Sequence, residues 1–260
     1  MPTIGFSLYG ARIGVRAYNT AALNALIAVF PPNWKRLASP RVDCQFTVSA
    51  DGPSLNHNSL TLYAGRKQIA VNEDLQKVVD AFEREMQLAI AQKARAKVFV
   101  HAGVVGWRGR AILIPGRTFT GKSTLVRALV RVGATYYSDE YAVLDTRGRV
   151  HPFARLLALR DEKYANQKIS FDELGGTIGS EPLPVGTILV THYREGAKWH
   201  PRRLTPGVGA LELLANTVTA RTKQVQVLKT LSRVTTQAVI LKSARGDART
   251  LAPQLLEMLG

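Results

Sequence analysis

The sequence predicts an α/β protein, α+β overall, with a small α+β domain at residues 1–96 and a larger domain at residues 97–260. Two observations support this prediction. Apolar runs with strand-like content alternate along the chain with apolar stripes at helical spacing. In the second domain, an apolar strand leads directly into a loop bounded by glycines and then into a helix. With 260 residues, the chain can bury a sizeable core in one large domain or two modest ones.

The first domain, residues 1–96, combines strand-like runs with two helices. The strand candidates share apolar or β-branched content and are set off by glycines or polar turns; they are residues 4–17, 44–49 and 60–71. Asn19 or Thr20 can cap a helix over residues 21–30, and a Pro-Pro pair ends it. A second helix opens after residues 72–74. Its apolar stripe at helical spacing is made by Leu75, Val78, Val79, Phe82, Met86, Ala89 and Ile90.

From Lys97 onward, in the second domain, the sequence pattern changes. The strands predicted here are residues 98–107, 111–114, 135–137 and 188–191. A helix follows the glycine-bounded loop and stops at Gly133, and another helix is predicted over residues 209–216. After Pro152 the signals weaken to short strands and turns, so residues 225–232 and 239–242 carry only weak predictions.

The formal net charge of +16 is the one unusual feature of the composition. It predicts attraction to phosphates, acidic peptides or nucleic acid, and residues 213–246 contain no acidic side chain. The basic residues are scattered, however, and no zinc-finger or RNA-recognition signature accompanies them, which favours a solvated surface over a nucleic-acid face. No apolar run approaches the roughly 18 residues that span a bilayer. With no secretory signal and a single cysteine, Cys44, we expect a cytoplasmic protein.

A phosphate-binding loop is the strongest motif. Residues 116–123 read GRTFTGKS and match G-x-x-x-x-G-K-[ST] at every fixed position, with a strand before and a helix after. Glycines let backbone amides approach phosphate oxygens, Lys122 supplies positive charge, and the Ser123 hydroxyl can join the shell of Mg²⁺. The expected ligands of the nucleotide are Gly116, Arg117, Thr118, Phe119, Thr120, Gly121, Lys122, Ser123 and Thr124.

Two adjacent acids, Asp139 and Glu140, end the strand that follows the loop's helix. Asp139 lies 17 residues beyond Lys122, a spacing that leaves room for one helix. In a parallel arrangement the ends of neighbouring strands meet, so these acids are predicted to face the nucleotide's last phosphate. One carboxylate could help to hold Mg²⁺ while the other accepts the proton of an attacking hydroxyl. Because side chains alternate along a strand, this needs the strand to end or kink here. An ordinary solvent-facing acidic turn is the alternative.

The run VHAGVVGWRGRAILIPGRTFTGKSTLVRALVRVGATYYSDEYAVLD resembles the catalytic core of HPr kinase/phosphorylase and its relatives, which share a fold core with phosphoenolpyruvate carboxykinases. That family places a strand with His-Gly or His-Ala, a hairpin, the phosphate loop, one helix and an Asp-Asp pair in this order. Here His101-Ala102, residues 116–123 and Asp139-Glu140 follow the same order at similar spacing. The resemblance implies a P-loop kinase core with a mixed sheet.

The resemblance also implies roles for single residues. Asp139 would be the catalytic base, His101 would orient or tune it, and Glu140 would replace the second Asp as a metal or charge partner. Arg155 or Arg160 would stabilise charge on the transferred phosphoryl group, although a surface role fits them equally well. The chain lacks the later acidic-x-Arg-Gly signature of enzymes that act on HPr, and its first domain does not look like theirs. Relatives that phosphorylate a serine hydroxyl of a peptide or small molecule are therefore the better match.

Two functional hypotheses follow. The first is an ATP- and Mg²⁺-dependent kinase that transfers the γ-phosphoryl group to a hydroxyl, expected to be that of a serine, of a protein, peptide or small-molecule acceptor. The basic surface favours an acidic acceptor. The second is a nucleotide-dependent binding module or NTPase associated with an anionic partner such as nucleic acid. A degenerate scaffold is disfavoured because Lys122, Ser123 and Asp139 are intact. We expect no membrane partner, and the sequence leaves a homo-oligomer open.

Overall fold

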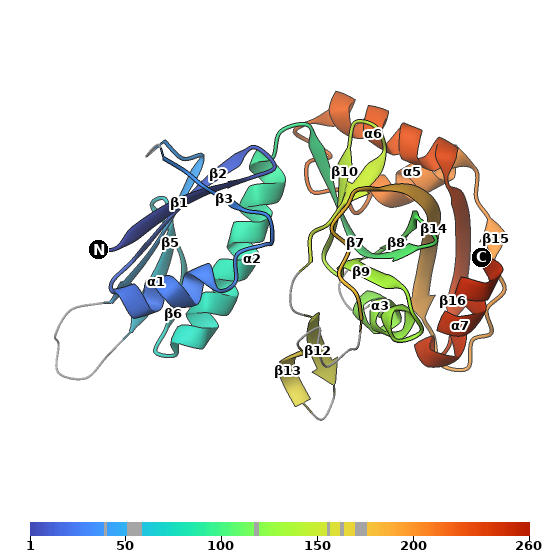
Figure 1. The fold of residues 1–260 in the computed structure, drawn as a ribbon, viewed down its shortest axis with the longest axis horizontal. Helices are drawn as coiled ribbons and strands as arrows, with labels where there is room; N and C mark the ends of the chain where they lie inside the picture. The colour runs from blue at the N-terminus through green and yellow to red at the C-terminus, as the bar shows by residue number, and fades with distance from the viewer. Residues whose placement is uncertain (39–40, 51–58, 117–119, 155–156, 162–163, 170–175) are drawn as a thin grey trace. The chain divides into compact units, whose positions relative to one another are not determined.

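A computed structural model describes the chain apart from residues 39–40, 51–58, 117–119, 155–156, 162–163 and 170–175. By its internal contacts the chain divides into two units, Met1–Arg95 and Ala96–Gly260, each built around its own mixed sheet (Figure 1). The protein is therefore a mixed α/β structure. The predicted turn at residues 51–54 lies outside the described residues.

The first unit is a six-stranded sheet with two helices. Its strands are β1 (Thr3–Leu8), β2 (Ala11–Ala17), β3 (Lys35–Arg36), β4 (Cys44–Ala50), β5 (Leu60–Ala64) and β6 (Lys67–Asn72), and its helices are α1 (Thr20–Ile27) and α2 (Leu75–Lys93). The strand order is β3-β1-β2-β4-β5-β6, in which only β2 and β4 run parallel. The predicted strand over residues 60–71 is thus two strands, because Gly65 with a φ of 60° turns the chain between them.

The apolar stripe predicted for the second helix, apart from the half-buried Leu75, lies in the core of the first unit. In α2, Val78, Phe82, Met86 and Ile90 are all fully buried. Phe82 packs edge-on against Phe46 of β4, with ring centroids 5.3 Å apart. Asp74 begins the helix by accepting a hydrogen bond from the backbone N of Gln76 at 2.8 Å.

The second unit contains an eight-stranded sheet and a separate hairpin. The sheet strands are β7 (Lys97–Trp107), β8 (Arg110–Pro115), β9 (Thr135–Ser138), β10 (Tyr141–Asp145), β11 (Arg149–His151), β14 (Leu183–Tyr193), β15 (Arg202–Arg203) and β16 (Val239–Arg245). The hairpin pairs β12 (Leu157–Asp161) with β13 (Tyr164–Ile169). The order of the sheet is β11-β10-β7-β8-β14-β16-β15, and β9 also pairs with β7.

Helices cover both faces of this sheet (Figure 1). They are α3 (Lys122–Arg131), α5 (Pro206–Leu214), α6 (Gln224–Gln237) and α7 (Ala248–Met258). On one face, α3 and α7 bury Leu125, Leu129, Leu251 and Leu255 against the odd-numbered side of β7 at Val105. On the other face, residues of α5 and α6 pack against the even-numbered residues of β7. This agrees with the alternation of side chains along a strand.

Strand β7 is the centre of this unit, because it is long enough to take two partners on one edge. On that edge it pairs first with β10, where His101 faces Tyr141, and then with β9, where Val104 faces Ser138. Its other edge pairs with β8, where Ala102 faces Pro115. All three pairings are antiparallel. Strands β8 and β9 therefore run in the same direction, as we predict, but β7 lies between them rather than leaving them as neighbours.

Two helices differ from the sequence predictions. The weakly predicted residues 225–232 lie in α6, whose buried positions Val227, Leu231 and Val234 have helical spacing. Val225 and Leu228 on its outer side are more than half exposed and obscure that spacing in the sequence. Helix α7 contains Pro253, a residue that normally argues against a helix interior. None of the described helices is long and apolar enough to cross a membrane.

Asp145 organises the turn between β10 and β11. It accepts hydrogen bonds from the backbone N of Arg147 at 2.9 Å, the backbone N of Arg149 at 3.0 Å and the ring of His151 at 3.0 Å. Burial alone would raise the pKa of this carboxyl group. The hydrogen bonds outweigh burial and lower the pKa from 3.8 to about 2.

The lowered pKa makes the stability of this unit sensitive to acid. Because the folded pKa lies below the unfolded one, the contribution is complete above pH 4 and is lost as the pH falls towards 2. We predict that Asp145→Asn lowers the free energy of unfolding at pH 7 by about 2 kcal/mol. Urea unfolding at pH 7 and at pH 3 measures this. The exposed Glu195→Gln is the control, and equal losses in both variants would contradict the assignment.

Candidate active site

The phosphate loop joins β8 to α3. Its first residue, Gly116, donates from its backbone N to the carbonyl oxygen of His101 at 3.3 Å, which fixes the start of the loop against β7. Gly121 ends the loop with a φ of 81° and is the N-cap of α3. A residue with a side chain would be strained in this left-handed conformation, so glycine is required. Gly121 also offers no side-chain cap to the first amides of α3, an arrangement suited to binding an anion.

The structure places six of the nine predicted nucleotide ligands. Arg117, Thr118 and Phe119 lie outside the described residues. Among the predicted ligands that the structure does place, Ser123 is half-buried and Thr124 is exposed. The loop is thus defined at both ends.

Lys122 is the first residue of α3 and is buried, with 7% of its surface exposed. Burial lowers the pKa of its ammonium group, and the carboxylates of Glu140 and Asp139 act in the opposite direction. Both acids therefore lie within electrostatic reach of the lysine. The net pKa stays lowered because desolvation is the largest effect. A bound phosphate would add negative charge beside Lys122 and favour its charged form.

The acid pair occupies a break between two strands. Strand β9 ends at Ser138 and β10 begins at Tyr141, so Asp139 and Glu140 form a bend on the edge of β7. The buried Ser138 hydroxyl accepts hydrogen bonds from the backbone N of Glu140 at 3.2 Å and of Tyr141 at 3.0 Å. These two hydrogen bonds stabilise the bend. The predicted end or kink of the strand at the acids is thus present, and it removes the strict alternation of neighbouring side chains.

Asp139 is the more buried acid. Only 3% of its surface is exposed, and its Oδ1 accepts a hydrogen bond from the hydroxyl of Tyr136 at 3.1 Å. Tyr136 is itself fully buried in β9. A hydroxyl donor stabilises the charged form of a buried carboxylate. Tyr136 was not predicted as a site residue, because no motif distinguishes it from the apolar residues of its strand.

His101 contacts the other acid, Glu140. Its Nε2 lies 3.2 Å from Oε1 of Glu140, and both side chains are partly exposed. The backbone N of Ala102 also donates to the carbonyl oxygen of Glu140 at 3.1 Å. The resemblance implies that His101 tunes Asp139 as the base. The structure brings His101 to the acid pair, but the contact that it makes is with Glu140.

Gly103 allows α3 to approach β7 closely. A Cβ atom at this position would lie 2.5 Å from Cγ2 of Val126 and 3.9 Å from Cβ of Lys122. In the pairing of β7 with β10 and β9, Gly103 lies opposite the bend that holds Asp139. The missing side chain therefore lets the start of α3, with Lys122, lie beside the acids.

Arg245 is a second feature without a sequence signal. It ends β16 and is buried, with 2% of its surface exposed. Its Nη2 donates to the carbonyl oxygen of Gly121 at 2.6 Å and so supports the last residue of the phosphate loop. Burial lowers the pKa of its guanidinium group. Only the fold brings β16 to the loop, which is 124 residues earlier in the chain.

The site fits a magnesium ion carried by a nucleotide better than a metal held by protein alone. Among the described residues, no group of three or more His, Cys, Asp or Glu side chains is placed to hold a metal. Mg²⁺ in phosphate-transfer sites needs one or two protein ligands besides phosphates and water. Ser123 in the first turn of α3 and Asp139 and Glu140 in the break between β9 and β10 carry oxygen donors of this kind. Of the two arginines expected to help, Arg155 lies outside the described residues, and only the backbone of Arg160 is described.

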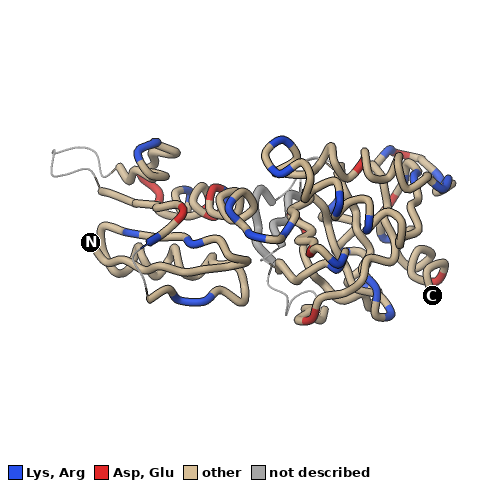
Figure 2. The backbone as a smooth tube through the Cα atoms, turned by 90° about the horizontal axis from the view of Figure 1, so that it is seen from above, with Lys and Arg blue, Asp and Glu red and all other residues tan. Residues whose placement is uncertain are grey.

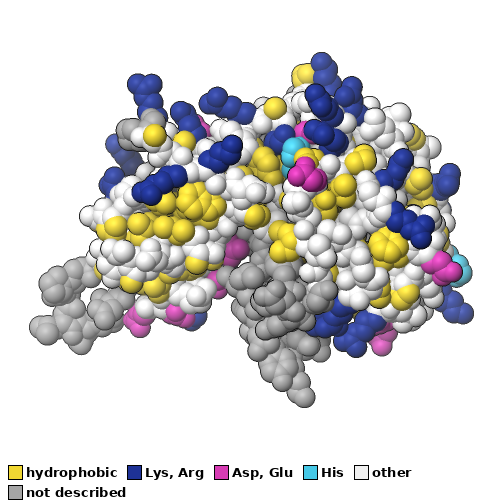
Figure 3. All heavy atoms as spheres, viewed as in Figure 1, with side chains coloured by type: hydrophobic (Ala, Val, Ile, Leu, Met, Phe, Trp, Pro, Cys, Tyr) yellow, Lys and Arg dark blue, Asp and Glu magenta, His cyan; other side chains and the backbone are white. Residues whose placement is uncertain are grey.

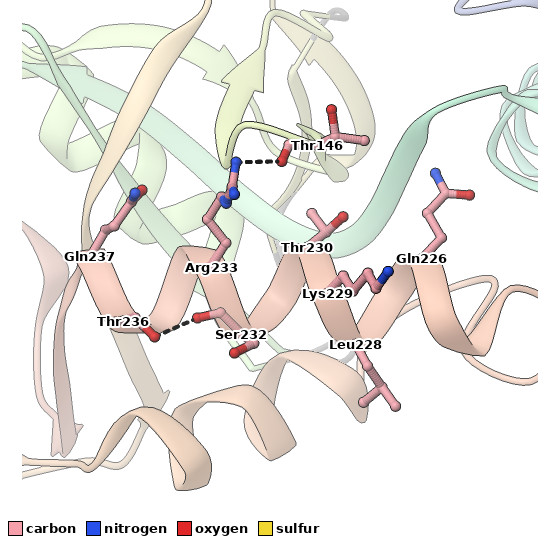
Figure 4. Close-up of a pocket in the computed structure, with 9 residues that line it drawn as sticks. All are labelled: Thr146, Gln226, Leu228, Lys229, Thr230, Ser232, Arg233, Thr236 and Gln237. Carbon is pink, nitrogen blue, oxygen red and sulfur yellow. Dashed lines mark hydrogen bonds between the residues drawn. The ribbon is translucent and has the colours of Figure 1, made fainter.

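A cavity of about 820 Å³ lies along α6 and the turn at Thr146 (Figure 4). Lys229, Arg233 and several uncharged polar residues line it, and Arg233 donates to the carbonyl oxygen of Thr146 at 3.2 Å. None of the predicted site residues takes part in it. It is therefore separate from the phosphate loop.

The positive charge is distributed over the chain. Lys and Arg recur along the backbone of both units in Figure 2 and are more numerous than Asp and Glu. On the face shown in Figure 3, their side chains are scattered among uncharged ones over each unit. This distribution agrees with a basic surface that is not gathered into one patch on this face.

The close approach at Gly103 gives a test of how the site is positioned. We predict that Gly103→Ala lowers the free energy of unfolding by about 1–3 kcal/mol, because Val126 and α3 must move. Gly207→Ala in α5 is the control, since its Cβ meets open space and should be neutral or slightly stabilising. Denaturant unfolding of both variants measures the difference. A neutral Gly103→Ala would show that α3 is not held at this distance.

No protein-family model matches this sequence, and a comparison with curated proteins finds no match. The resemblance to the HPr kinase core therefore rests on the order and spacing of the motifs at residues 100–145.

Proposed function

We propose that the protein is an ATP-dependent phosphotransferase of the HPr kinase-like type, which transfers the γ-phosphoryl group to a hydroxyl of an acceptor. The observation that carries this proposal is the position of Lys122. It begins the helix after a phosphate-loop motif and lies within electrostatic reach of two carboxylates from another strand. Kinases of known mechanism combine a phosphate cradle, positive charge and a carboxylate base beside the last phosphate. An ordinary solvent-facing acidic turn would not bury Asp139 within electrostatic reach of a buried lysine.

Each residue has a part in the proposed reaction. The loop amides and Lys122 bind the phosphates of ATP and orient the last one toward the acids. Asp139 accepts the proton of the acceptor hydroxyl as the oxygen–phosphorus bond forms, and the bond between the β and γ phosphates breaks to leave ADP. The hydrogen bond from Tyr136 holds the Asp139 carboxylate in one orientation. Lys122 and the loop amides stabilise the charge on the phosphate oxygens.

Ser123 and Glu140 would hold Mg²⁺, with Asp139 close by. When bound, Mg²⁺ would neutralise charge on the β and γ phosphates. The contact between His101 and Glu140 keeps that carboxylate in place. The same contact raises the alternative that Glu140 takes the proton and Asp139 supports the metal, and substitution of each acid separates the two assignments.

The acceptor is proposed to be a serine hydroxyl of a protein, peptide or small molecule in the cytoplasm. A surface with a net charge of +16 favours an acidic or phosphorylated acceptor. HPr itself is not proposed, because the chain lacks the acidic-x-Arg-Gly signature.

A nucleotide-dependent binding module or NTPase is the second candidate, and the positive charge is the observation that favours it. Such a protein would bind an anionic partner such as nucleic acid with an affinity that falls steeply with salt. It would release phosphate to water or retain it, and no acceptor would become labelled.

Loss of the loop lysine tests nucleotide binding. We predict that Lys122→Ala weakens ATP binding at least about 30-fold, because removing one partner of a buried charge pair costs about 2–5 kcal/mol. Isothermal titration with Mg²⁺ and ATP measures the affinity. Arg131→Ala, in the last turn of the same helix, is the control. Unchanged affinity in Lys122→Ala would refute the phosphate-loop assignment.

Loss of the base tests the chemistry. We predict that Asp139→Asn lowers the rate of transfer about 10²- to 10⁴-fold while ATP binding is largely kept. The assay follows label from γ-labelled ATP into products of neighbouring genes, with Glu140→Gln as the matched variant. A larger loss in Glu140→Gln would exchange the roles of the two acids. Label transfer that survives Asp139→Asn unchanged would exclude this residue as the base.

A further inference from the structure

The edge of the phosphate loop away from the acids is formed by the ends of two parallel strands. Tyr193 ends β14 and Arg245 ends β16, and they are paired in the register of these strands. The backbone N of Tyr193 donates to the carbonyl oxygen of Thr120 at 3.3 Å, and Arg245 donates to that of Gly121 at 2.6 Å. Both residues thus contact the loop itself.

Tyr193 presents an aromatic ring beside the loop. Tyr193 is 55% exposed, although its backbone N bonds to the loop. The guanidinium carbon of Arg245 lies over its ring, 5.8 Å from the centroid. This contact restricts the ring while leaving much of its surface open to a ligand.

Arg245 is buried with its charge incompletely satisfied. Besides the bond to Gly121, its Nη1 donates to the carbonyl oxygen of Gly246 at 3.0 Å. Its Nε has no hydrogen-bond partner among the described residues, although it is buried. A buried guanidinium with an unpaired donor is costly, and Arg245 bears this cost while it supports Gly121, the N-cap of α3.

The order of the strands determines on which side a nucleoside would lie. The acids are on the β7 side of β8, and Tyr193 and Arg245 are on the opposite, β14 side. A nucleotide with its last phosphate at Asp139 and its remainder directed away from the acids would place its nucleoside at the ends of β14 and β16.

We propose that Tyr193 forms the nucleoside subsite of the bound nucleotide, with Arg245 as a positioning residue that supports both the ring and Gly121. This rests on the proposed function. The base stacks on the ring of Tyr193, and since every base has a π-face the subsite accepts ATP and GTP with similar affinity.

The test compares ATP with inorganic tripolyphosphate, which carries the phosphates without a nucleoside. For the unchanged protein, we expect ATP to bind more tightly than tripolyphosphate. Tyr193→Ala should weaken ATP binding about 5- to 100-fold, because loss of base stacking has this magnitude, and should leave tripolyphosphate binding unchanged. Tyr193→Phe should keep the affinity for ATP. His192→Ala, the exposed neighbour on the same strand, is the control.

A spectroscopic readout is independent of affinity. In Tyr193→Trp, ATP should quench the fluorescence of the new indole ring and tripolyphosphate should not. Equal affinity of the unchanged protein for both ligands, or equal weakening of both by Tyr193→Ala, would overturn the subsite while leaving the phosphate loop intact. If neither ligand binds the unchanged protein, the proposed function fails and this inference fails with it.

Discussion

The second unit depends on the burial of a lysine ammonium group beside two carboxylates. Lys122, Asp139 and Glu140 come from a helix and from a break between strands, and removing charges from water is unfavourable unless they offset one another. The structure meets this condition through backbone geometry. Gly103 lets α3 come close to β7, and the hydroxyl of Ser138 stabilises the bend that carries the acids by accepting two hydrogen bonds. We propose that this charge arrangement serves to receive a phosphate.

Strand β7 carries the geometry from the sheet to the site. On one edge, β7 pairs first with β10 and then with β9. The two acids lie where the pairing passes from one of these strands to the other. Its other edge leads, through β8, into the phosphate loop. His101 belongs to this same stretch of β7, and its backbone and ring contact the loop at Gly116 and the acid Glu140 respectively. One strand therefore sets the relative positions of loop, histidine and acids.

Local patterns were enough to predict the parts of this site that follow one another along the chain. The loop between a strand and a helix, the stop at Gly133 and the break at the acids all depend on neighbouring residues, and the structure contains them. Tyr136, Arg245 and the contact of His101 with Glu140 depend on tertiary structure, and no spacing in the sequence encodes them. The antiparallel β7 between β8 and β9 was missed for the same reason. Helices α6 and α7 were obscured by exposed apolar residues and by Pro253.

The central claim is that the phosphate loop and the acid pair form one nucleotide site. A crystal structure of the protein with Mg²⁺ and a non-hydrolysable ATP analogue tests it most directly. We predict density for the triphosphate along the loop, with its last phosphate between Lys122 and Asp139 and its nucleoside against Tyr193. A nucleotide bound elsewhere, or a last phosphate directed away from both acids, would contradict the account.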